Sequence, residues 1–162
     1  FIMTANPITI RRAILDDAAH IVSFNTALAA ETEGKTLDAR TITIGVREAL
    51  TDPGRSLYFL AEMDSEVIGQ TMVTFEWSDW RNAFFWWIQS VYVDSRFRRR
   101  GVFRALHDHV RREAYSRPDV CGLRLYVHHD NHRAMKTYAQ LGMTQCDYFM
   151  CEEDWSSAKR TD

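Results

Sequence analysis

The chain has 162 residues, of which 46% are hydrophobic and 26% charged, a composition that indicates a folded globular protein and excludes a disordered one. Twenty basic and 22 acidic side chains give a net charge of −2, so no overall basic field favours nucleic acid as a partner. No apolar run approaches the ~20 residues that cross a bilayer, and we expect no membrane partner.

Hydrophobic alternation, helix caps and turn residues divide the chain into predicted elements. In chain order these are a strand over 8–13, a helix from 17 to about 30, a polar break over 31–35, a helix over 38–51, strands over 57–63, 67–75 and 83–93, a helix from 101 to about 116, a strand over 122–128, a helix over 131–141 and a final strand over 144–152. The order β-α-α-β-β-β-α-β-α-β predicts a mixed α/β fold, with an antiparallel meander followed by a βαβ crossover.

Neither a linker rich in Ser, Gly or Pro nor an internal repeat interrupts the chain. We therefore expect a single domain over 1–162. Residues 1–7 are expected to form a flexible N-terminus, in part an added remnant before a natural start at Met3, and 154–162 a tail.

The cysteines and the first residues bear on the compartment. Cys121, Cys146 and Cys151 are an odd number without metal-ligand spacing, so we expect small apolar fillers in a reducing environment and no metal. The start of the chain lacks the charged and apolar regions of a secretory signal. Both observations favour a cytoplasmic protein.

A basic loop connects the strand over 83–93 to the helix that begins near Gly101. The first N–H groups of a helix have no internal partner and carry about half a positive charge, so backbone alone can bind a pyrophosphate there. The glycine permits close approach, and guanidinium groups bind phosphate oxygens. The arginines of this segment are Arg98, Arg99, Arg100 and Arg104. Taken alone, the run is also typical of a solvated turn or a short nucleic-acid patch.

A second motif lies in the predicted helix over 131–141. Asn131 can cap its N-terminus, and Gly142 can end it. Tyr138 lies two turns beyond Asn131 on nearly the same face, and Ala134 is small enough to pack under a cofactor arm. Taken alone, Asn131 is also explained as a plain cap and Tyr138 as a core aromatic.

Together the two motifs resemble the acetyl-CoA-dependent N-acetyltransferases of the GNAT superfamily. The first is similar to the family signature Gln/Arg-x-x-Gly-x-Gly/Ala, with Arg98 and Gly101 matching and Phe103 in place of the usual small residue. The second matches Asn-x-x-Ala-x-x-x-Tyr-x-x-x-Gly-Phe/Met at every specified position. The resemblance covers roughly the C-terminal half of the chain. It implies a GNAT-like, mostly antiparallel sheet of about six to seven strands with helices on both faces.

The resemblance also implies how acetyl-CoA is held. The pantetheine amides are expected along the strand before the arginine turn, bound through its backbone where the fourth and fifth strands splay apart, and the pyrophosphate at the turn. The cofactor-binding residues implied in this way are Val91, Tyr92, Val93, Arg98, Arg99, Arg100, Gly101, Val102, Phe103, Arg104, Asn131, Ala134 and Tyr138. Asn131 is expected to contact the pantetheine or a bound water.

Transfer of an acetyl group from a thioester releases a thiolate. The pKa of its conjugate acid is about 8.5, against about 10 for a phenol, so a neighbouring tyrosine can return a proton to the sulfur. The resemblance assigns this general-acid role to Tyr138.

The proton on the acceptor amine has no evident base. Many family members carry a carboxylate on the strand that enters the signature, but residues 84–90 contain none, and Gln89 and Ser90 can only hold a water. Glu31 and Glu33 lie in the break that borders the acceptor site in family members. We expect one of them to contact a cationic acceptor, with Gln89 as a water relay; exposed loop acids are the alternative.

Two further groups of residues leave alternatives open. His128 and His129 are expected at the surface, with a role as the base as the alternative. Aromatic side chains cluster around one hairpin and are expected in the core, or else in an acceptor wall or a homodimer contact. These are Trp77, Trp80, Phe84, Phe85, Trp86 and Trp87.

The expected function is therefore transfer of an acetyl group from acetyl-CoA to a primary amine of a small molecule or peptide. The missing carboxylate favours an alternative, a non-catalytic CoA-binding or regulatory module with the same fold. A nucleic-acid binder using the arginine turn is a third hypothesis, which the net negative charge opposes.

Overall fold

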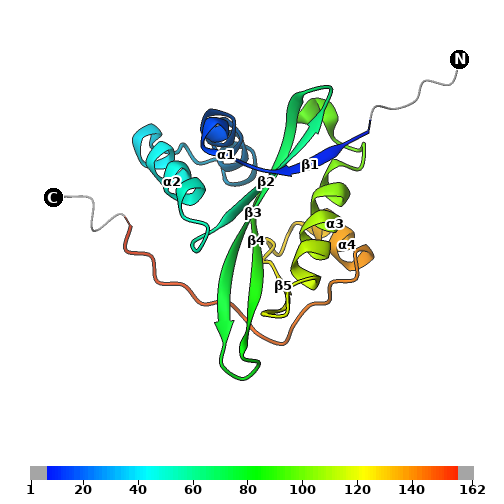
Figure 1. The fold of residues 1–162 in the computed structure, drawn as a ribbon. Helices are drawn as coiled ribbons and strands as arrows, with labels where there is room; N and C mark the ends of the chain where they lie inside the picture. Colours follow the sequence, from blue (N-terminus) through cyan, green and yellow to red (C-terminus); the bar gives the residue numbers. More distant parts are fainter. Residues whose placement is uncertain (1–6, 157–162) are drawn as a thin grey trace, which may run out of the picture. The chain divides into compact units, whose positions relative to one another are not determined.

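The computed structural model describes residues 7–156, which fall into two compact units, one ending at Tyr126 and the other beginning at Val127. Figure 1 shows the elements, which in chain order are β1 (Thr9–Arg12), the 3-10 turn η1 (Leu15–Asp17), α1 (Ala18–Glu33), α2 (Ala39–Thr51), β2 (Leu57–Met63), β3 (Glu66–Ser78), β4 (Ala83–Val93), the 3-10 turn η2 (Ser95–Phe97), α3 (Val102–Tyr115), β5 (Val120–Arg124) and α4 (His132–Gln140). The expected remnant before Met3 and the last residues of the expected tail lie outside the described range.

All the strands belong to one sheet in the first unit, in the order β1-β2-β3-β4-β5. Neighbouring strands are antiparallel except β4 and β5, which are parallel. The parallel pair follows from the crossover through α3, because a chain can return in the same direction only by such a connection. The mixed, mostly antiparallel fold is confirmed, but the sheet has five strands in the described residues instead of six to seven.

The missing strand is the predicted one over 144–152. This prediction is wrong for the described chain, because residues 143–155 contain neither helix nor strand. The segment carries aromatic and other apolar residues over 148–151 that favour a strand, but such a preference takes effect only where a neighbouring strand pairs with it. The prediction over 122–128 also needs correction: β5 lies at Val120–Arg124 and ends where its pairing with β4 ends.

The predicted break after the first helix begins too early. α1 continues through residues 31–33 and ends only at Gly34, which adopts a left-handed φ of 62°. The prediction of buried cysteines is wrong as well, since Cys121, Cys146 and Cys151 are all exposed and unpaired.

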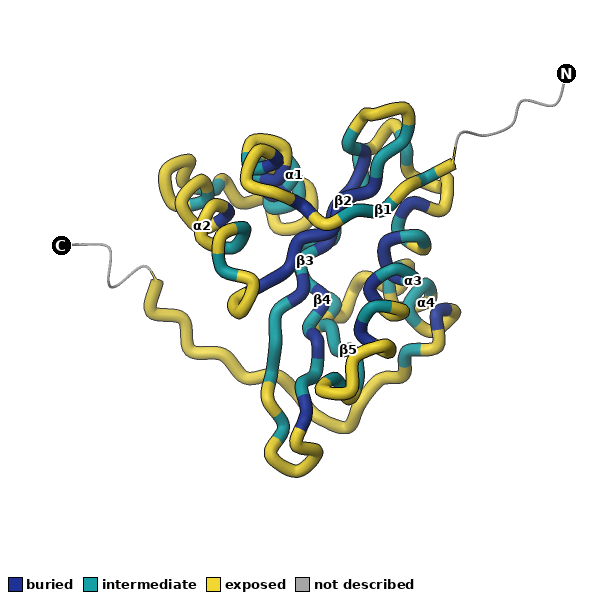
Figure 2. The backbone as a smooth tube through the Cα atoms, in the orientation of Figure 1, coloured by how far each residue is buried: buried dark blue, intermediate teal, exposed yellow. Residues whose placement is uncertain are grey.

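Helices cover both faces of the sheet in the first unit, as predicted (Figure 2). α3 packs on one face with Val102, Leu106 and Val110, against a cluster that includes Phe59 and Trp86. α1 and α2 pack on the other face, where Ile21 and Val46 meet Tyr58 and Leu60. Successive residues of β2 therefore point to opposite layers, as the two-residue period of a strand requires.

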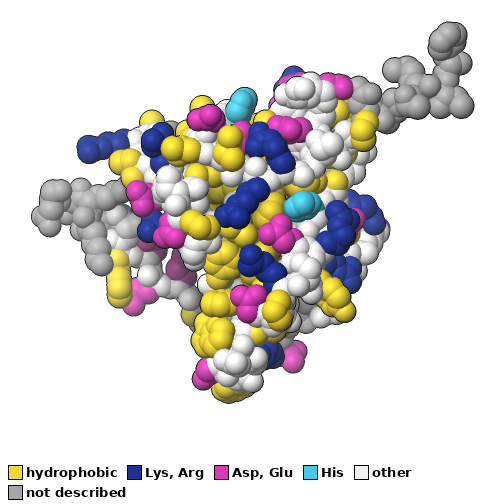
Figure 3. Space-filling view, in the orientation of Figure 1, with side chains coloured by type: hydrophobic (Ala, Val, Ile, Leu, Met, Phe, Trp, Pro, Cys, Tyr) yellow, Lys and Arg dark blue, Asp and Glu magenta, His cyan; other side chains and the backbone are white. Residues whose placement is uncertain are grey.

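The aromatic hairpin between β3 and β4 is only in part a core. Trp86 is fully buried, whereas 50% of Trp77 and 86% of Trp80 are exposed. Hydrophobic side chains accordingly reach the surface at the tip of this hairpin, the lower end of the view in Figure 3. The core interpretation is confirmed for Trp86 and wrong for Trp77 and Trp80. Among the described residues no helix combines the length and apolarity of a membrane span.

Candidate functional site

The predicted phosphate-binding turn is a left-handed corner between β4 and α3. Arg99 has a φ of 64° and Gly101 a φ of 83°, and Gly101 is the N-cap of α3. A Cβ added to Gly101 would meet no atom within 4 Å. The space beside Gly101 is therefore open, and the first α3 amides have no partner inside the helix. The predicted helix start is confirmed, and a phosphate at this position stays a prediction.

Among the arginines of the turn, Arg98 makes a set of contacts within the protein. Its guanidinium donates to Glu31 Oε2 at 2.6 Å and to the carbonyl of Val93 at 2.9 Å, and it lies 5.5 Å from the centre of the Tyr92 ring. The Tyr92 hydroxyl donates to the other oxygen of Glu31 at 3.0 Å. The Arg98 guanidinium holds the pKa of Glu31 below its usual range, and burial raises the pKa of Tyr92.

The two acids expected near the acceptor are therefore placed differently. Glu31 lies on the last turn of α1 and is tied to the basic turn, whereas Glu33 is exposed and pairs with Lys35 at 2.6 Å. The contact between Glu31 and Arg98 was missed because it joins residues 67 positions apart. No local pattern signals such a contact. The predicted acceptor contact of either acid is not tested by this geometry.

A β-bulge interrupts β4 at the start of the predicted pantetheine strand. Gln70 pairs with Tyr92 and Met72 with Gln89, so Ser90 and Val91 together stand opposite a single residue of β3. Ser90 has a φ of 49°, which is uncommon for a residue other than glycine and is typical of functional sites.

The pairing of β4 with β5 also ends before this bulge. The last paired residues are Trp87 and Arg124, so β4 has no strand partner on this side over 88–93 in the described residues. The backbone groups of residues 91–93 that point to this edge lie outside any ladder. The predicted contact with an extended amide chain fits this edge and stays a prediction.

A buried polar network supports the bulge from three other elements. The Gln70 side-chain amide donates to Asn25 Oδ1 at 2.7 Å and to the Ser90 carbonyl at 3.2 Å, and the Asn25 amide donates to the Tyr58 hydroxyl at 3.1 Å. Burial raises the pKa of Tyr58, and side-chain hydrogen bonds with Asn25 and Ser90 oppose part of that shift. The network joins α1, β2, β3 and β4 without a charged group. Sequence reasoning missed it, although Asn25 inside an apolar helix stretch was a signal.

A cavity of about 290 Å³ opens beside this network. Its polar lining consists of Asn25, Tyr58 and Ser90, which the network connects. Its apolar lining comes from α1, α2 and β3 and comprises Leu28, Ala29, Ile42, Gly45, Val46, Ala49 and Met72. None of these described lining residues carries a charge. The cavity includes neither Glu31 nor Glu33. No local sequence pattern indicates this cavity, because its walls come from five separate elements.

Gln89, the expected water relay, is engaged within the sheet. Its side-chain amide donates to Thr74 Oγ1 at 2.5 Å, and its carbonyl accepts from Thr71 Oγ1 at 3.4 Å. Gln89 does not belong to the residues that line the cavity. Its role as a relay stays a prediction.

The second motif lies in the second unit and has the predicted local structure. Asn131 caps α4, accepting from the Ala134 amide at 3.0 Å, and Gly142 follows the helix with a φ of 85°. Tyr138 is half-buried, and burial raises its pKa. A phenol with a raised pKa keeps its proton at neutral pH, which a general acid requires.

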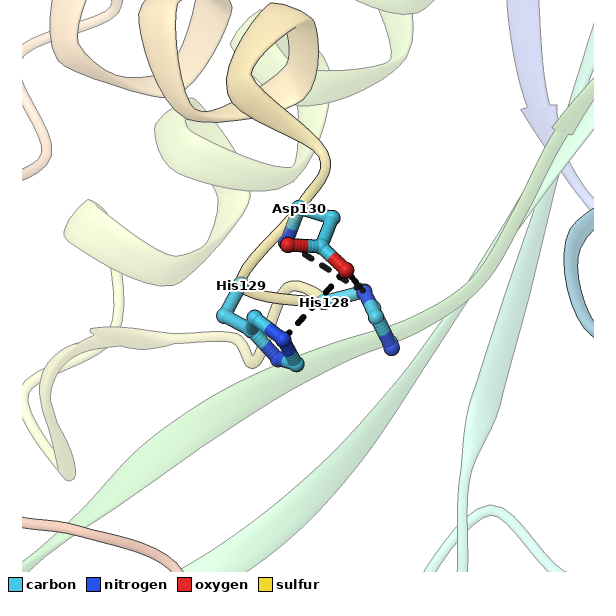
Figure 4. A group of neighbouring side chains, drawn as sticks. All are labelled: His128, His129 and Asp130. Carbon is cyan, nitrogen blue, oxygen red and sulfur yellow. Dashed lines mark hydrogen bonds and ion pairs between the residues drawn. The ribbon is translucent and has the colours of Figure 1, made fainter.

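The histidines before α4 lie on an exposed loop, as predicted for surface residues. Figure 4 shows both rings beside the carboxylate of Asp130, which lies 3.3 Å from His129 Nε2 and 3.8 Å from His128 Nδ1. The two rings stack at 4.5 Å, and ligand atoms of the three side chains lie within 4.8 Å of one another. All three are exposed, so this group lacks the enclosed surroundings that fix metal ligands in place.

Residues 22–143 match the family model described as the acetyltransferase (GNAT) family. The fold and this match define an acetyltransferase domain. The chain belongs to the GNAT acetyltransferase family, whose members use acetyl-CoA. None of the curated proteins compared with the chain matches it.

Solved structures with the same fold agree with this assignment. The chain is 44% identical to a possible acetyltransferase from Clostridium difficile 630, with a TM-score of 0.86 over 91% of this chain and 97% of that one. A ribosomal-protein-alanine N-acetyltransferase from Brucella melitensis biovar Abortus 2308 is 18% identical, with a TM-score of 0.75 over 91% and 99%. A predicted acetyltransferase with acetyl-CoA from Clostridium acetobutylicum is 18% identical, with a TM-score of 0.73 over 93% and 98%. The last two likenesses concern the fold alone.

Proposed function

We propose that the protein transfers an acetyl group from acetyl-CoA to the primary amine of a small molecule or peptide, in a reducing cytoplasm and without a metal. Nucleic acid and membranes are not partners in this proposal, and a homodimer is compatible with it. The observation that carries it is the open corner at Gly101, where a Cβ would meet no atom within 4 Å. The first α3 amides lack a partner inside the helix and Arg99, Arg100 and Arg104 are exposed, so the turn offers hydrogen-bond donors suited to a diphosphate.

Acetyl-CoA supplies the acetyl thioester, and attack by the amine nitrogen forms the amide bond as the carbon–sulfur bond breaks. In the proposal Tyr138 holds a proton on its hydroxyl and delivers it to the departing sulfur. The Tyr138 phenol is protonated at neutral pH, as a general acid must be, although burial raises its pKa and so makes it a weaker proton donor than an exposed tyrosine. In the proposal the β4 edge over 91–93, which no strand covers in the described residues, orients the extended arm.

The amine is proposed to reach the thioester through the cavity that ends at Ser90. This placement is supported by adjacency in the chain, because Ser90 directly precedes the edge assigned to the pantetheine. The amine must lose a proton before it attacks. In the proposal this proton leaves through water held near the bulge, with Gln89 as a relay, because no described lining residue is a carboxylate.

A thiol-release assay with acetyl-CoA and a panel of primary amines tests the proposal, with calorimetry of coenzyme A binding beside it. We expect saturable binding and release that depends on the amine. The missing carboxylate favours a second candidate, a CoA-binding regulatory module. Binding without turnover on any amine would establish that candidate, and absence of binding would exclude both.

A further inference from the structure

The cavity at Ser90 has a polar end and an apolar body. Asn25, Tyr58 and Ser90 are joined by hydrogen bonds and therefore form one polar group, while every other lining residue is apolar. On α2 the apolar side is built from Ile42, Gly45, Val46 and Ala49, which recur at helical spacing and so share one face.

Gly45 is unusual in this wall. It stands in the middle of α2, where glycine is unfavourable relative to alanine, and its φ does not require a glycine. A Cβ at this position would meet no atom within 4 Å, so no neighbouring group of the described protein explains the missing side chain. Gly45 lines the cavity, so a larger side chain at this position would take space from a ligand bound there.

From these observations we propose that the acceptor is a small monoamine with an uncharged, apolar body lying over Gly45, and that Gly45 determines the acceptor size. This inference rests on the proposed acetyl transfer and names its substrate class. The volume of about 290 Å³ corresponds to roughly ten non-hydrogen atoms, since one water occupies about 30 Å³ in the liquid. A linear or aryl-substituted alkylamine has this size.

The charge of the lining separates this class from polyamines and amino sugars. A second ammonium group in the cavity would lose its water shell without meeting a carboxylate, and a sugar would leave several hydroxyls unpaired against Leu28, Ile42 and Met72. An apolar monoamine brings only one polar group into the cavity, which is the reacting nitrogen. The polar end at Asn25, Tyr58 and Ser90 lies where that nitrogen would reside.

The same surroundings bear on the missing base. At the polar end the amine nitrogen meets uncharged groups only, so no carboxylate stabilises its ammonium form, and the loss of water on binding lowers its pKa. The transfer of the acceptor out of water then supplies part of the free energy needed to deprotonate its amine. Acetyl transfer to an apolar monoamine therefore depends less on a basic side chain than transfer to a polyamine does.

The test compares 2-phenylethylamine, spermidine and glucosamine as acceptors in the thiol-release assay. We expect the highest kcat/KM with 2-phenylethylamine. Substituting Gly45→Leu should raise the KM for 2-phenylethylamine by about tenfold or more through overlap in the cavity and leave the KM for acetyl-CoA unchanged. Thr43→Leu is the matched control, because Thr43 is exposed on the same helix and does not line the cavity.

Gly45→Ala checks the fold as well as the site. It should raise the melting temperature, since alanine favours the helix, and it should raise the acceptor KM less than leucine does. A preference for spermidine or glucosamine would overturn the inference and leave acetyl transfer standing, and so would an unchanged KM in Gly45→Leu. Release with none of the three acceptors or the wider amine panel, despite tight coenzyme A binding, would overturn the proposed transfer itself.

Discussion

At the scale of single residues, a substitution of Tyr138 separates an effect on the chemical step from an effect on cofactor binding. Tyr138→Phe removes the hydroxyl that returns a proton to the sulfur in the proposed mechanism and keeps the ring. We expect kcat to fall by about 10²-fold or more while the dissociation constant of acetyl-CoA is unchanged. Steady-state kinetics and calorimetry measure the two quantities. Tyr148→Phe is the control, because Tyr148 is 78% exposed; an equal loss in both variants would remove the acid role.

Substitutions of Glu31 and Glu33 test the contact with Arg98, because only Glu31 of these two acids makes that contact. Removing the Glu31 charge frees the guanidinium for phosphate, so Glu31→Gln should tighten acetyl-CoA binding by about two- to fivefold, the range of an exposed ion pair. Glu33→Gln should leave the affinity unchanged, since Glu33 pairs with Lys35. Calorimetry at low salt gives both constants. Weaker binding in Glu31→Gln would mean that Glu31 serves to orient Arg98 for its phosphate.

At the scale of elements, the corner between β4 and α3 makes a prediction about Gly101. Gly101→Asp places a carboxylate in the open space and adds strain at a φ of 83°. Binding of coenzyme A should be lost. Gly34→Asp is the control, because Gly34 also has a positive φ and open space around it, at the end of α1.

Both variants should lose about 1 kcal/mol of unfolding free energy, because a side chain at positive φ is strained. Only Gly101→Asp should lose the cofactor. Urea melts and calorimetry separate the two effects, and retained affinity in Gly101→Asp would move the pyrophosphate elsewhere.

How well the sequence predicts each element depends on where its determinants lie. β4 was predicted at its observed bounds, and α2 and α3 within a residue, because caps, glycines and apolar periods are local. The segment over 144–152 has strand composition without an observed ladder, since strand formation depends on a partner elsewhere in the chain. The motif positions around Gly101 and Asn131 could likewise be read locally. The Glu31–Arg98 contact and the cavity could not, because distant elements create them.

At the scale of the whole molecule, a buried histidine makes stability depend on pH. His107 on α3 is 3% exposed, and neither ring nitrogen has a hydrogen-bond partner among the described residues. Burial lowers the pKa of His107, while the nearby Asp108 opposes the shift and Arg104 and Arg111 add to it.

Below the ordinary histidine pKa of about 6.5, the His107 ring therefore binds a proton more readily in the unfolded chain than in the folded one. Stability contributed by the neutral ring is present above that pH and decreases as the pH falls below it. His107→Leu should reduce this pH dependence, because leucine is buried without charging. Thermal melts at pH 7.5 and pH 5.5 measure the effect; an identical pH dependence in both proteins would assign it to other groups.

The Glu31–Arg98 bridge has a consequence for how the binding of one substrate affects the affinity for the other. Glu31 lies on α1, whose preceding turn lines the cavity. Arg98 lies in the corner that is proposed to hold the diphosphate. If a bound phosphate draws Arg98 away from Glu31, α1 loses the contact that restrains it. The free energy of breaking this contact then contributes to the binding of both the cofactor and the acceptor. Thermodynamic reciprocity then requires each substrate to change the other's affinity by one and the same factor. Such a protein would show interdependent Michaelis constants instead of two independent ones.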